Sequence, residues 1–231
     1  HGFLSFLRYY MRDIYSIGSI VEDRPAESKM LQLSVARQLG MNIPDTCFAN
    51  YKDAFDDLCH SHQEISLKPI SSSSVYVDDD KEYVFYSQKT DSKNIMSQAP
   101  AAFSQTACFL QNYIEKQYEL RITVCGNDFV ACKIDSQSQS DTTGKIDWRQ
   151  GYDYDLRQEI VDIPDSIKDF CSGFLKKMKL NFGCFDFIVT PDDDYVFLEC
   201  NPNGQWLWIE LDTGFDISKI VAKNLVLNEI I

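Results

Sequence analysis

The chain has 231 residues, of which 44% are hydrophobic and 13% aromatic, so it can bury a sizeable core and general disorder is excluded. Its 22 basic and 35 acidic residues give a net charge of −13, which argues against nucleic acid as a partner. Eight cysteines at irregular spacings, without a CxxC pair, indicate reduced thiols and a cytoplasmic protein.

The first segment, FLSFLRYYMRDIYSIGSIV, is amphipathic and predicts a helix. It lacks the long apolar run of a signal peptide or a membrane span, so no association with a membrane is expected. Because this helix has no earlier partner to pack on, we expect the chain to be a fragment or to lack an N-terminal domain.

A helix is expected to begin at residues 24–27, where Pro25 suits the first helical position, and to end at Gly40. Lys29 lies off the apolar stripe of this helix. A short connection then leads to a second helix near residues 52–60.

Residues 65–70 have the apolar character of a buried strand, and residues 75–77 and 83–86 flank an acidic turn as a hairpin. The serines at 71–74 predict a flexible loop between these strands. A further apolar strand is expected at 109–114.

Residues 120–124 and 129–134 flank Gly-Asn-Asp, which predicts another hairpin. The polar stretch 135–149 predicts a mobile loop. The strongest helical pattern lies at 167–178, where apolar residues recur at i, i+3, i+4, i+7, i+8 and i+11, and a last helix is expected at 218–228.

The segment FDFIVTPDDDYVFLECNPNG predicts a hairpin whose simplest closure pairs Thr190 with Tyr195. Counting back from that pair sets Asp186 directly opposite Glu199, and Asn201 projects from the same face. The opposite face is apolar and is expected to be buried. It consists of Phe185, Phe187, Val189, Val196, Leu198 and Cys200.

Directly opposed residues in a sheet have Cβ atoms roughly 5 Å apart, so two opposed carboxylates destabilise it unless positive charge lies between them. Together with the Asn201 amide oxygen they make an oxygen-only site of the kind that Mg²⁺ prefers when it also binds nucleotide phosphates. The alternative is two separate surface charges on an edge hairpin, which the apolar opposite face disfavours.

Such a site would need basic groups for the phosphates. Taken singly, each candidate is more simply a solvated surface charge, except Lys68, which ends a buried strand and needs a partner. The candidates are Lys29, Lys68, Arg121, Lys133 and Arg149.

Six motifs follow one another in order: RPAESKMLQL, GMNIPDT, YIEKQYELRITVCG, KIDSQ, DWR and ECNPNGQWLWIE. This ordered set resembles the ATP-grasp superfamily, and within it the graspetide macrocyclases that make microviridin-like peptides. The resemblance implies an α+β ATP-grasp fold in which two lobes sandwich ATP, with the N-terminal domain missing or truncated. Residues 1–110 would form the helical start and the smaller lobe, and residues 111–231 the larger catalytic lobe with the metal site.

The resemblance also implies how the nucleotide is bound. Lys29 and Lys68 would grip its phosphates, Glu119 would hold the ribose hydroxyls, and the serine loop at 71–74 would fold over the phosphates. The hinge that contacts adenine would contain Gln111, Tyr113 and Ile114.

By the same resemblance, Mg²⁺ would be carried by Asp186, Glu199 and Asn201. Arg121 and Arg149 would lie near the γ-phosphate and the developing oxyanion. The expected catalytic set is Arg121, Arg149 and Lys133.

We therefore expect an ATP- and Mg²⁺-dependent carboxylate ligase. It would form ester or amide links between acidic side chains and Thr, Ser or Lys side chains of a ribosomally made precursor peptide, through an acyl phosphate. The expected partners are the leader and core of that peptide and, in a homodimer, a second copy; residues 151–163 would form a hairpin that docks the leader.

Two alternatives remain open. One is a RimK-type ligase that adds an amino acid to a protein or a small molecule. The other is a nucleotide- or peptide-binding module without catalysis.

Overall fold

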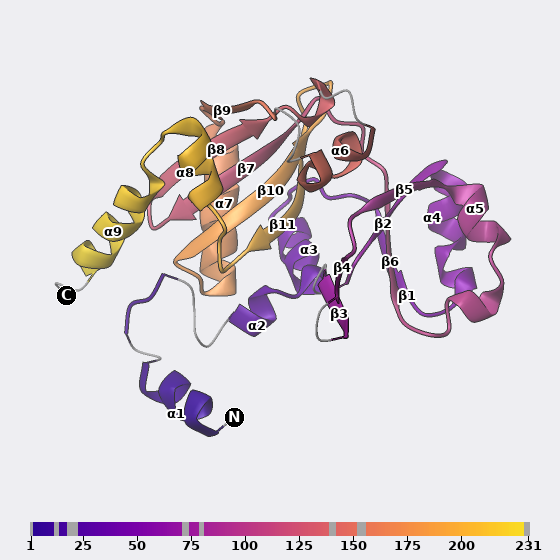
Figure 1. Cartoon of the computed structure of the whole chain (residues 1–231), viewed down its shortest axis with the longest axis horizontal. Coiled ribbons are helices and arrows are strands. Elements are labelled where there is room, and N and C mark those ends of the chain that lie inside the picture. Colours follow the sequence, from indigo (N-terminus) through magenta and orange to yellow (C-terminus); the bar gives the residue numbers. More distant parts are fainter. Residues whose placement is uncertain are drawn as a thin grey trace.

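The chain folds into two lobes built on antiparallel sheets (Figure 1), so the α+β class expected from the sequence is confirmed. Among the described residues, no helix is long and apolar enough to cross a bilayer. The computed structural model describes residues 2–11, 14–17, 23–70, 74–78, 81–138, 142–151 and 156–228.

The larger sheet has five strands in the order β11-β10-β7-β8-β9, and each neighbouring pair is antiparallel. One face packs against α3 (Lys29–Gln38) and α7 (Asp165–Met178). The other face packs against α8 (Leu207–Thr213) and α9 (Ile217–Asn228). The strands are β7 (Tyr118–Cys125), β8 (Asp128–Ile134), β9 (Gln158–Val161), β10 (Phe182–Val189) and β11 (Tyr195–Asn201).

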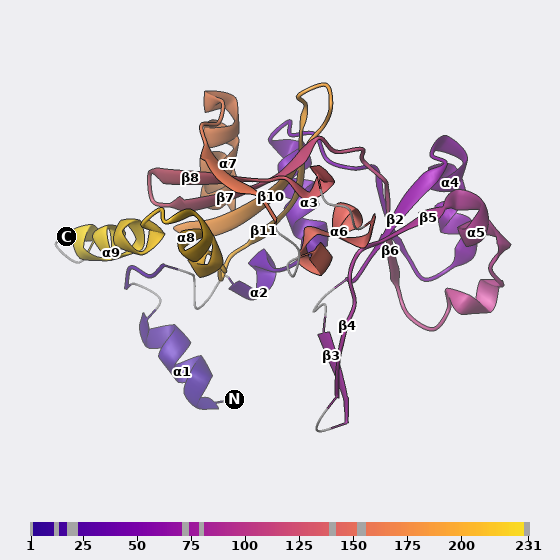
Figure 2. The same ribbon diagram turned by 45° about the horizontal axis from the view of Figure 1, so that its top comes forward.

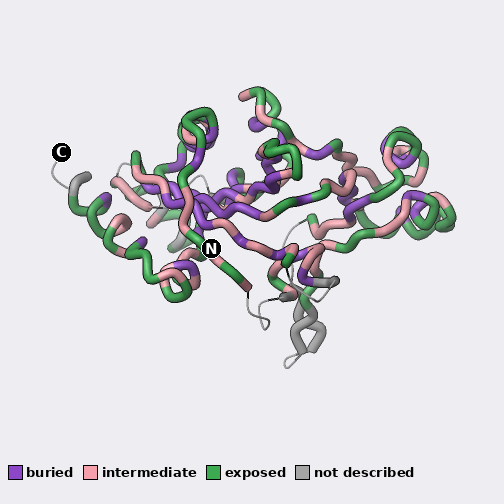
Figure 3. The backbone as a smooth tube through the Cα atoms, turned by 90° about the horizontal axis from the view of Figure 1, so that it is seen from above, coloured by how far each residue is buried: buried purple, intermediate pink, exposed green. Residues whose placement is uncertain are grey.

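The main core lies between the larger sheet and the pair α3 and α7. The apolar stripe expected on α7 is confirmed, because all six of its members are buried. Aromatic rings from this helix meet rings from the sheet at close range: the Phe174 and Phe185 centroids are 5.4 Å apart, as are those of Phe170 and Phe197. In Figure 3 the buried stretches accordingly run through the middle of the molecule.

The smaller lobe contains a four-stranded sheet in the order β1-β6-β2-β5, covered by short helices around a second core. The hairpin of β3 and β4 projects from this lobe (Figure 2) and matches the expected pair of strands. The strands are β1 (Thr46–Ala49), β2 (Glu64–Lys68), β3 (Ser74–Asp78), β4 (Lys81–Val84), β5 (Gln88–Asp91) and β6 (Cys108–Asn112). The helices are η1 (Lys52–Phe55), α4 (Asp56–Ser61), α5 (Ser92–Ser97) and η2 (Pro100–Ala102).

The helix expected from residue 24 onwards is two helices, α2 (Asp23–Ala26) and α3. They are separate because Ser28 caps α3: its Oγ accepts a hydrogen bond from Leu31 N at 3.4 Å. The opening helix is shorter than expected, since α1 (Gly2–Met11) ends before residues 14–17, which are not helical.

The loop expected at 135–149 is largely wrong, because its described part contains η3 (Ser136–Ser138), α6 (Thr142–Ile146) and the start of η4 (Trp148–Gly151). The described part of 151–163 contains a single strand, β9, which pairs with β8. Within the serine loop, residues 71–73 lie outside the described ranges. The division at 110/111 stays a prediction, although β6 runs across it.

The hairpin of β10 and β11 has the expected register at its open end, where Asp186 lies opposite Glu199. The expected pair of Thr190 and Tyr195 is wrong, because Val189 pairs with Tyr195. A β-bulge leaves Leu198 as one extra residue in β11 and so shifts the register.

The bulge also exchanges the two faces of β11. Phe197 joins the main core, whereas Leu198, which was expected to be buried there, is half-buried and lines the cavity described below. Val196 is buried but lies outside the main core. The predicted apolar face is therefore confirmed for the residues of β10 and for Cys200. It is wrong for Val196 and Leu198, which do not belong to the main core.

Replacing Phe174 with alanine is expected to lower the free energy of unfolding by about 3–5 kcal/mol, because its fully buried ring would leave a cavity against the sheet. Chemical denaturation followed by circular dichroism measures this loss. The matched control is Phe85→Ala, at a side chain that is 53% exposed, and it is expected to change stability by less than about 0.5 kcal/mol. Equal losses in the two variants would contradict the core described here.

Candidate active site

A cavity of about 970 Å³ lies between the two sheets and the start of α3. Eleven of the twelve site residues expected from the sequence line it. These are Lys29, Lys68, Gln111, Tyr113, Ile114, Glu119, Arg121, Arg149, Asp186, Glu199 and Asn201.

Lys133 is the exception. Its neighbours Cys132 and Ile134 on β8 pack toward α8 and α9, so strand alternation turns Lys133 to the other face. There its Nζ lies 4.7 Å from the centroid of the Tyr118 ring. The structure therefore does not bring Lys133 to the cavity, and we propose no catalytic role for it.

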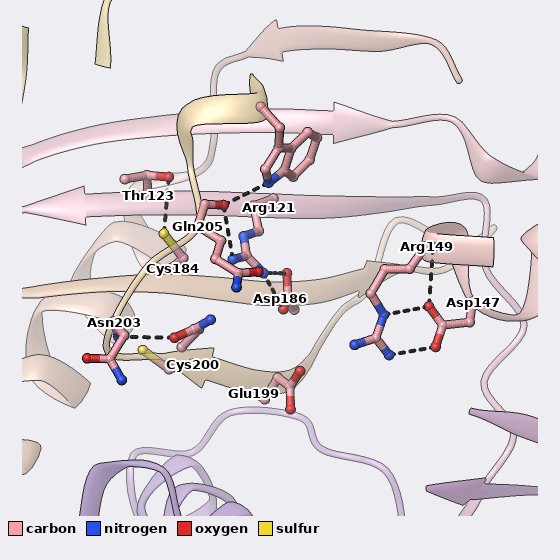
Figure 4. A network of polar contacts seen from close by, with 12 residues as sticks. Arg121, Thr123, Asp147, Arg149, Cys184, Asp186, Glu199, Cys200, Asn203 and Gln205 are labelled. Carbon is pink, nitrogen blue, oxygen red and sulfur yellow. Dashed lines mark hydrogen bonds and ion pairs between the residues drawn. The ribbon is translucent and has the colours of Figure 1, made fainter. Parts of the chain in front are cut away.

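The acidic face of the cavity is formed by Asp186 on β10 and by Glu199 and Asn201 on β11. Figure 4 shows Asp186 and Glu199 on these neighbouring strands. Arg121 Nη1 donates to both oxygens of Asp186, at 2.9 Å and 2.8 Å. Lys29 Nζ lies 2.8 Å from Glu199 Oε2. Each carboxylate thus has its own cation, which offsets the repulsion expected between them.

These contacts set the charge states on the acidic face. Burial alone would raise the pKa of Glu199, but Lys29, Lys68 and Arg149 outweigh burial and lower this pKa to about 2. Burial raises the pKa of Asp186 against the opposing effect of Arg121. Glu199 is therefore ionised throughout the physiological pH range.

The donor set fits Mg²⁺ that is held partly by the protein and partly by phosphate oxygens and water. No group of three or more His, Cys, Asp or Glu with metal-binding geometry occurs among the residues that the structure describes. The protein side of the site would be two carboxylates and the Asn201 amide oxygen. Asn201 Oδ1 accepts from Asn203 N at 3.0 Å and keeps a second lone pair.

Lys68 is the last residue of β2, and its side chain lines the cavity. No ion pair joins it to any of the described residues, in contrast to Lys29. Burial lowers the pKa of Lys68 to about 8, and this effect exceeds the opposing effect of Glu199. Among the described residues, therefore, Lys68 is a cavity cation that no carboxylate pairs.

The hinge strand β6 carries Gln111 at the far side of the cavity, with 1% of its surface exposed. Its Nε2 donates to Thr46 Oγ1 at 2.9 Å, whereas its Oε1 is buried and has no hydrogen-bond partner. A buried acceptor without a donor is costly. The exocyclic amine of adenine would satisfy it, so this end of the cavity fits the base of ATP.

Glu119 lies in the cavity on β7 and forms an ion pair with Lys116, a residue that the sequence did not single out. Lys116 also donates to Ile146 O at 2.9 Å, so it connects Glu119 to α6. Burial raises the pKa of Glu119 to about 7 although Lys116 lowers it. Its place in the YIEK motif is the one sequence signal that could have pointed to Lys116.

Asp147 is a second residue that sequence reasoning missed. It receives hydrogen bonds from Arg149 Nε at 2.8 Å and Nη2 at 2.6 Å, and its Oδ2 accepts from Ser87 N at 3.2 Å (Figure 4 shows the arginine pair). Burial would raise its pKa, but Arg149 lowers it. Asp147 thus orients the guanidinium of Arg149 and connects this arginine to the smaller lobe. The DWR motif could have pointed to Asp147 from the sequence.

The chain matches the model of the RimK-like ATP-grasp domain over residues 26–225, which is most of its length. The chain belongs to the RimK-like ATP-grasp family. This membership confirms the superfamily and the fold that the sequence motifs resemble. The comparison of this ATP-grasp chain with curated proteins found no match.

Solved structures show the same relationship. A RiPP-associated ATP-grasp ligase from Chryseobacterium gregarium, solved with ADP and a leader and core peptide, has a TM-score of 0.84 and 27% identity over 97% of this chain and 66% of its own. The macrocyclase MdnC from Microcystis aeruginosa MRC, bound with precursor peptide MdnA, has a TM-score of 0.78 and 29% identity over 96% and 67%. This ATP-grasp chain therefore spans 66% and 67% of the length of these two enzymes.

A more distant structure shares the fold alone. The D-alanine–D-alanine ligase from Bacillus anthracis has a TM-score of 0.67 and 16% identity, with 98% of this chain and 74% of that chain covered.

The affinity for ADP is expected to fall as the pH rises from about 7 to about 9, because Lys68 loses its proton near pH 8 in the free protein. Below that pH the ammonium is present and attracts phosphate, and above it binding must first take up a proton. Isothermal titration calorimetry at several pH values measures the effect. Lys68→Arg keeps its charge over this range and is expected to abolish the dependence; an unchanged pH profile in that variant would contradict the role of Lys68.

Proposed function

We propose that this chain is the catalytic part of an ATP-dependent peptide ligase. It would join Asp or Glu side chains of a ribosomally made precursor peptide to its Thr, Ser or Lys side chains. The peptide carboxylate would attack the γ-phosphorus of ATP, releasing ADP and forming an acyl phosphate. The hydroxyl or amine would then attack the acyl carbon and lose its proton, and phosphate would leave.

The observation that carries this proposal is the acidic face of the cavity, opposite a half-buried cation, Lys68, that has no ion-pair partner among the described residues. Asp186 and Glu199 lie across paired strands, and Lys68 ends β2 in the other lobe of the same cavity. Such a cavity suits a polyphosphate that enters with its metal ion. The peptide-bound ligase and MdnC, both above 25% identity, support a peptide as the acceptor.

The nucleotide would lie along the cavity with its base at the hinge. Gln111 Oε1 would accept from the adenine amine, next to Tyr113 and Ile114 in the cavity wall. Glu119 would accept from the ribose hydroxyls, and its ion pair with Lys116 would hold that side chain in place. The phosphates would then reach Lys68 and the acidic face.

Mg²⁺ bound by Asp186, Glu199 and Asn201 would neutralise charge on the phosphates as the phosphoryl group is transferred. Lys29 would exchange its contact with Glu199 for a phosphate oxygen. Arg121 and Arg149 would stabilise negative charge near the γ-phosphate and at the acyl carbon, since both guanidinium groups are already held in the cavity by carboxylates.

The remaining parts of the proposal concern partners and location. The leader of the precursor would dock on the segment 151–163 that carries β9, and the enzyme would act as a homodimer. Eight free cysteines support a reducing compartment, the cytoplasm.

The proposal is tested by incubating the protein with ATP, Mg²⁺ and the precursor peptide encoded beside its gene. Formation of ADP together with loss of one water per link, seen by mass spectrometry, is the expected result. ADP formed only when a free amino acid is supplied would favour the RimK-type ligase. Nucleotide binding without either product would favour a binding module without catalysis.

Glu199→Gln is expected to keep the fold and to lower the rate of peptide cyclisation by about 100-fold or more, because an amide binds Mg²⁺ more weakly than a carboxylate. The rate is measured by mass spectrometry and the fold by thermal melting. The matched control is Asp192→Asn, an acid-to-amide change in the exposed turn of the same hairpin, which is expected to retain activity. Wild-type activity in Glu199→Gln would contradict the metal assignment.

A further inference from the structure

Gln32 is a buried amide on α3, one turn after Lys29, with 2% of its surface exposed. It makes three hydrogen bonds, and all of them go to the main chain. Its Nε2 donates to Ala26 O at 2.6 Å and to Cys200 O at 2.7 Å. Its Oε1 accepts from Cys200 N at 2.8 Å.

The partner of Gln32 lies on an edge strand. β11 is the first strand of the larger sheet, so its outward main-chain groups face no further strand among the described residues. At Cys200 the Gln32 amide supplies both the donor and the acceptor that another strand would have supplied. Beyond the bulge, Phe197 N donates to Asn42 O at 2.9 Å, so the chain around α3 closes this edge at two points.

Cys200 stands between two of the three residues of the acidic face. Its own side chain is buried in the main core, and alternation along the strand turns Glu199 and Asn201 toward the cavity. Holding both main-chain groups of Cys200 fixes the rotation of β11 about its axis. The directions of Glu199 and Asn201 follow from that rotation.

We propose that Gln32 is a positioning residue for the metal-binding face: it fixes the main chain of β11 at Cys200 so that Glu199 and Asn201 converge on one ion. This inference rests on the proposed function. It differs from the role of Lys29, whose contact is with the Glu199 side chain and competes with a metal. The contact of Gln32 is with the main chain, so it persists when Glu199 binds an ion.

The test replaces Gln32 with methionine, which keeps the length of the side chain and removes its polar groups. Hydrogen exchange followed by mass spectrometry is expected to show faster exchange of the Cys200 amide by about 10-fold or more, because its acceptor is lost. Calorimetry measures ADP binding with and without Mg²⁺. The gain in affinity on adding Mg²⁺ is expected to fall by about 10- to 100-fold.

Binding of ADP without Mg²⁺ is expected to stay within about twofold of wild type, because the hinge and Lys68 are unchanged. A general loss of structure would lower the affinity for ADP equally with and without Mg²⁺. A loss confined to the measurement with Mg²⁺ therefore distinguishes a positioning role from a role in folding. Gln38→Met is the matched control: it is the same substitution on the same helix at an exposed position, and it is expected to change neither measurement.

Gln32→Asn, which keeps the amide but is shorter, is a milder second variant and is expected to lose part of the Mg²⁺ effect. The inference would be overturned if the Cys200 amide of Gln32→Met exchanged as slowly as in wild type. It would also be overturned if Mg²⁺ increased the affinity of this variant for ADP as much as in wild type. Failure of both variants to fold would overturn it as well, because Gln32 would then serve the fold as a whole.

The outcome is distinguishable from failure of the proposed function. Wild-type protein that binds ADP without any effect of Mg²⁺ would contradict the metal site itself. The exchange rate of the Cys200 amide needs neither ADP nor metal, and it would still decide whether Gln32 holds β11.

Discussion

The structure is organised around two carboxylates that face each other across a pair of strands. Asp186 and Glu199 lie close enough to repel, and both are half-buried in the cavity. The fold meets this constraint with cations from separate parts of the chain: Arg121 comes from the adjoining strand and Lys29 from the start of α3. A hairpin in isolation would have neither cation, so the acidic face depends on tertiary structure.

The opposite side of the same hairpin anchors the acidic face to the core. Phe185 and Phe187 of β10 pack into the core with Phe170 and Phe174 of α7, and this packing holds the sheet against one layer of helices. The cavity face is then free to carry charge. α3 contributes to both sides, because it packs on the core and also carries Lys29 and Gln32 toward β11.

Charge is distributed unevenly among the cations of the cavity. Lys29, Lys116 and Arg121 each have a carboxylate partner, whereas Lys68 has none among the described residues. Two kinds of cation follow from this difference. The paired ones hold carboxylates in place, and Lys68, whose pKa burial lowers to about 8, is the one that we propose to bind a phosphate.

The expected pairing of Asp186 with Glu199 is correct because the bulge at Leu198 offsets the wrong pairing expected at the turn. The sequence by itself determined that these two segments form a hairpin and that α7 is an amphipathic helix, because such patterns depend only on neighbours along the chain. It did not determine the bulge at Leu198. An extra residue is accommodated according to what packs on each face, and no local pattern marks it.

The ordered motifs likewise allowed the family and eleven cavity residues to be predicted, yet Lys133 was placed wrongly at the site. Whether the Lys133 side chain faces the cavity depends on which face of the larger sheet is covered by α8 and α9. Gln32 was missed because its partner is a main-chain group of β11 that only folding brings near. Lys116 and Asp147 have ion-pair partners close in the sequence, but their contacts with Ile146 and Ser87 also form only on folding. The tertiary structure decided these contacts, since hydrogen bonds between distant segments exist only after the lobes have packed together.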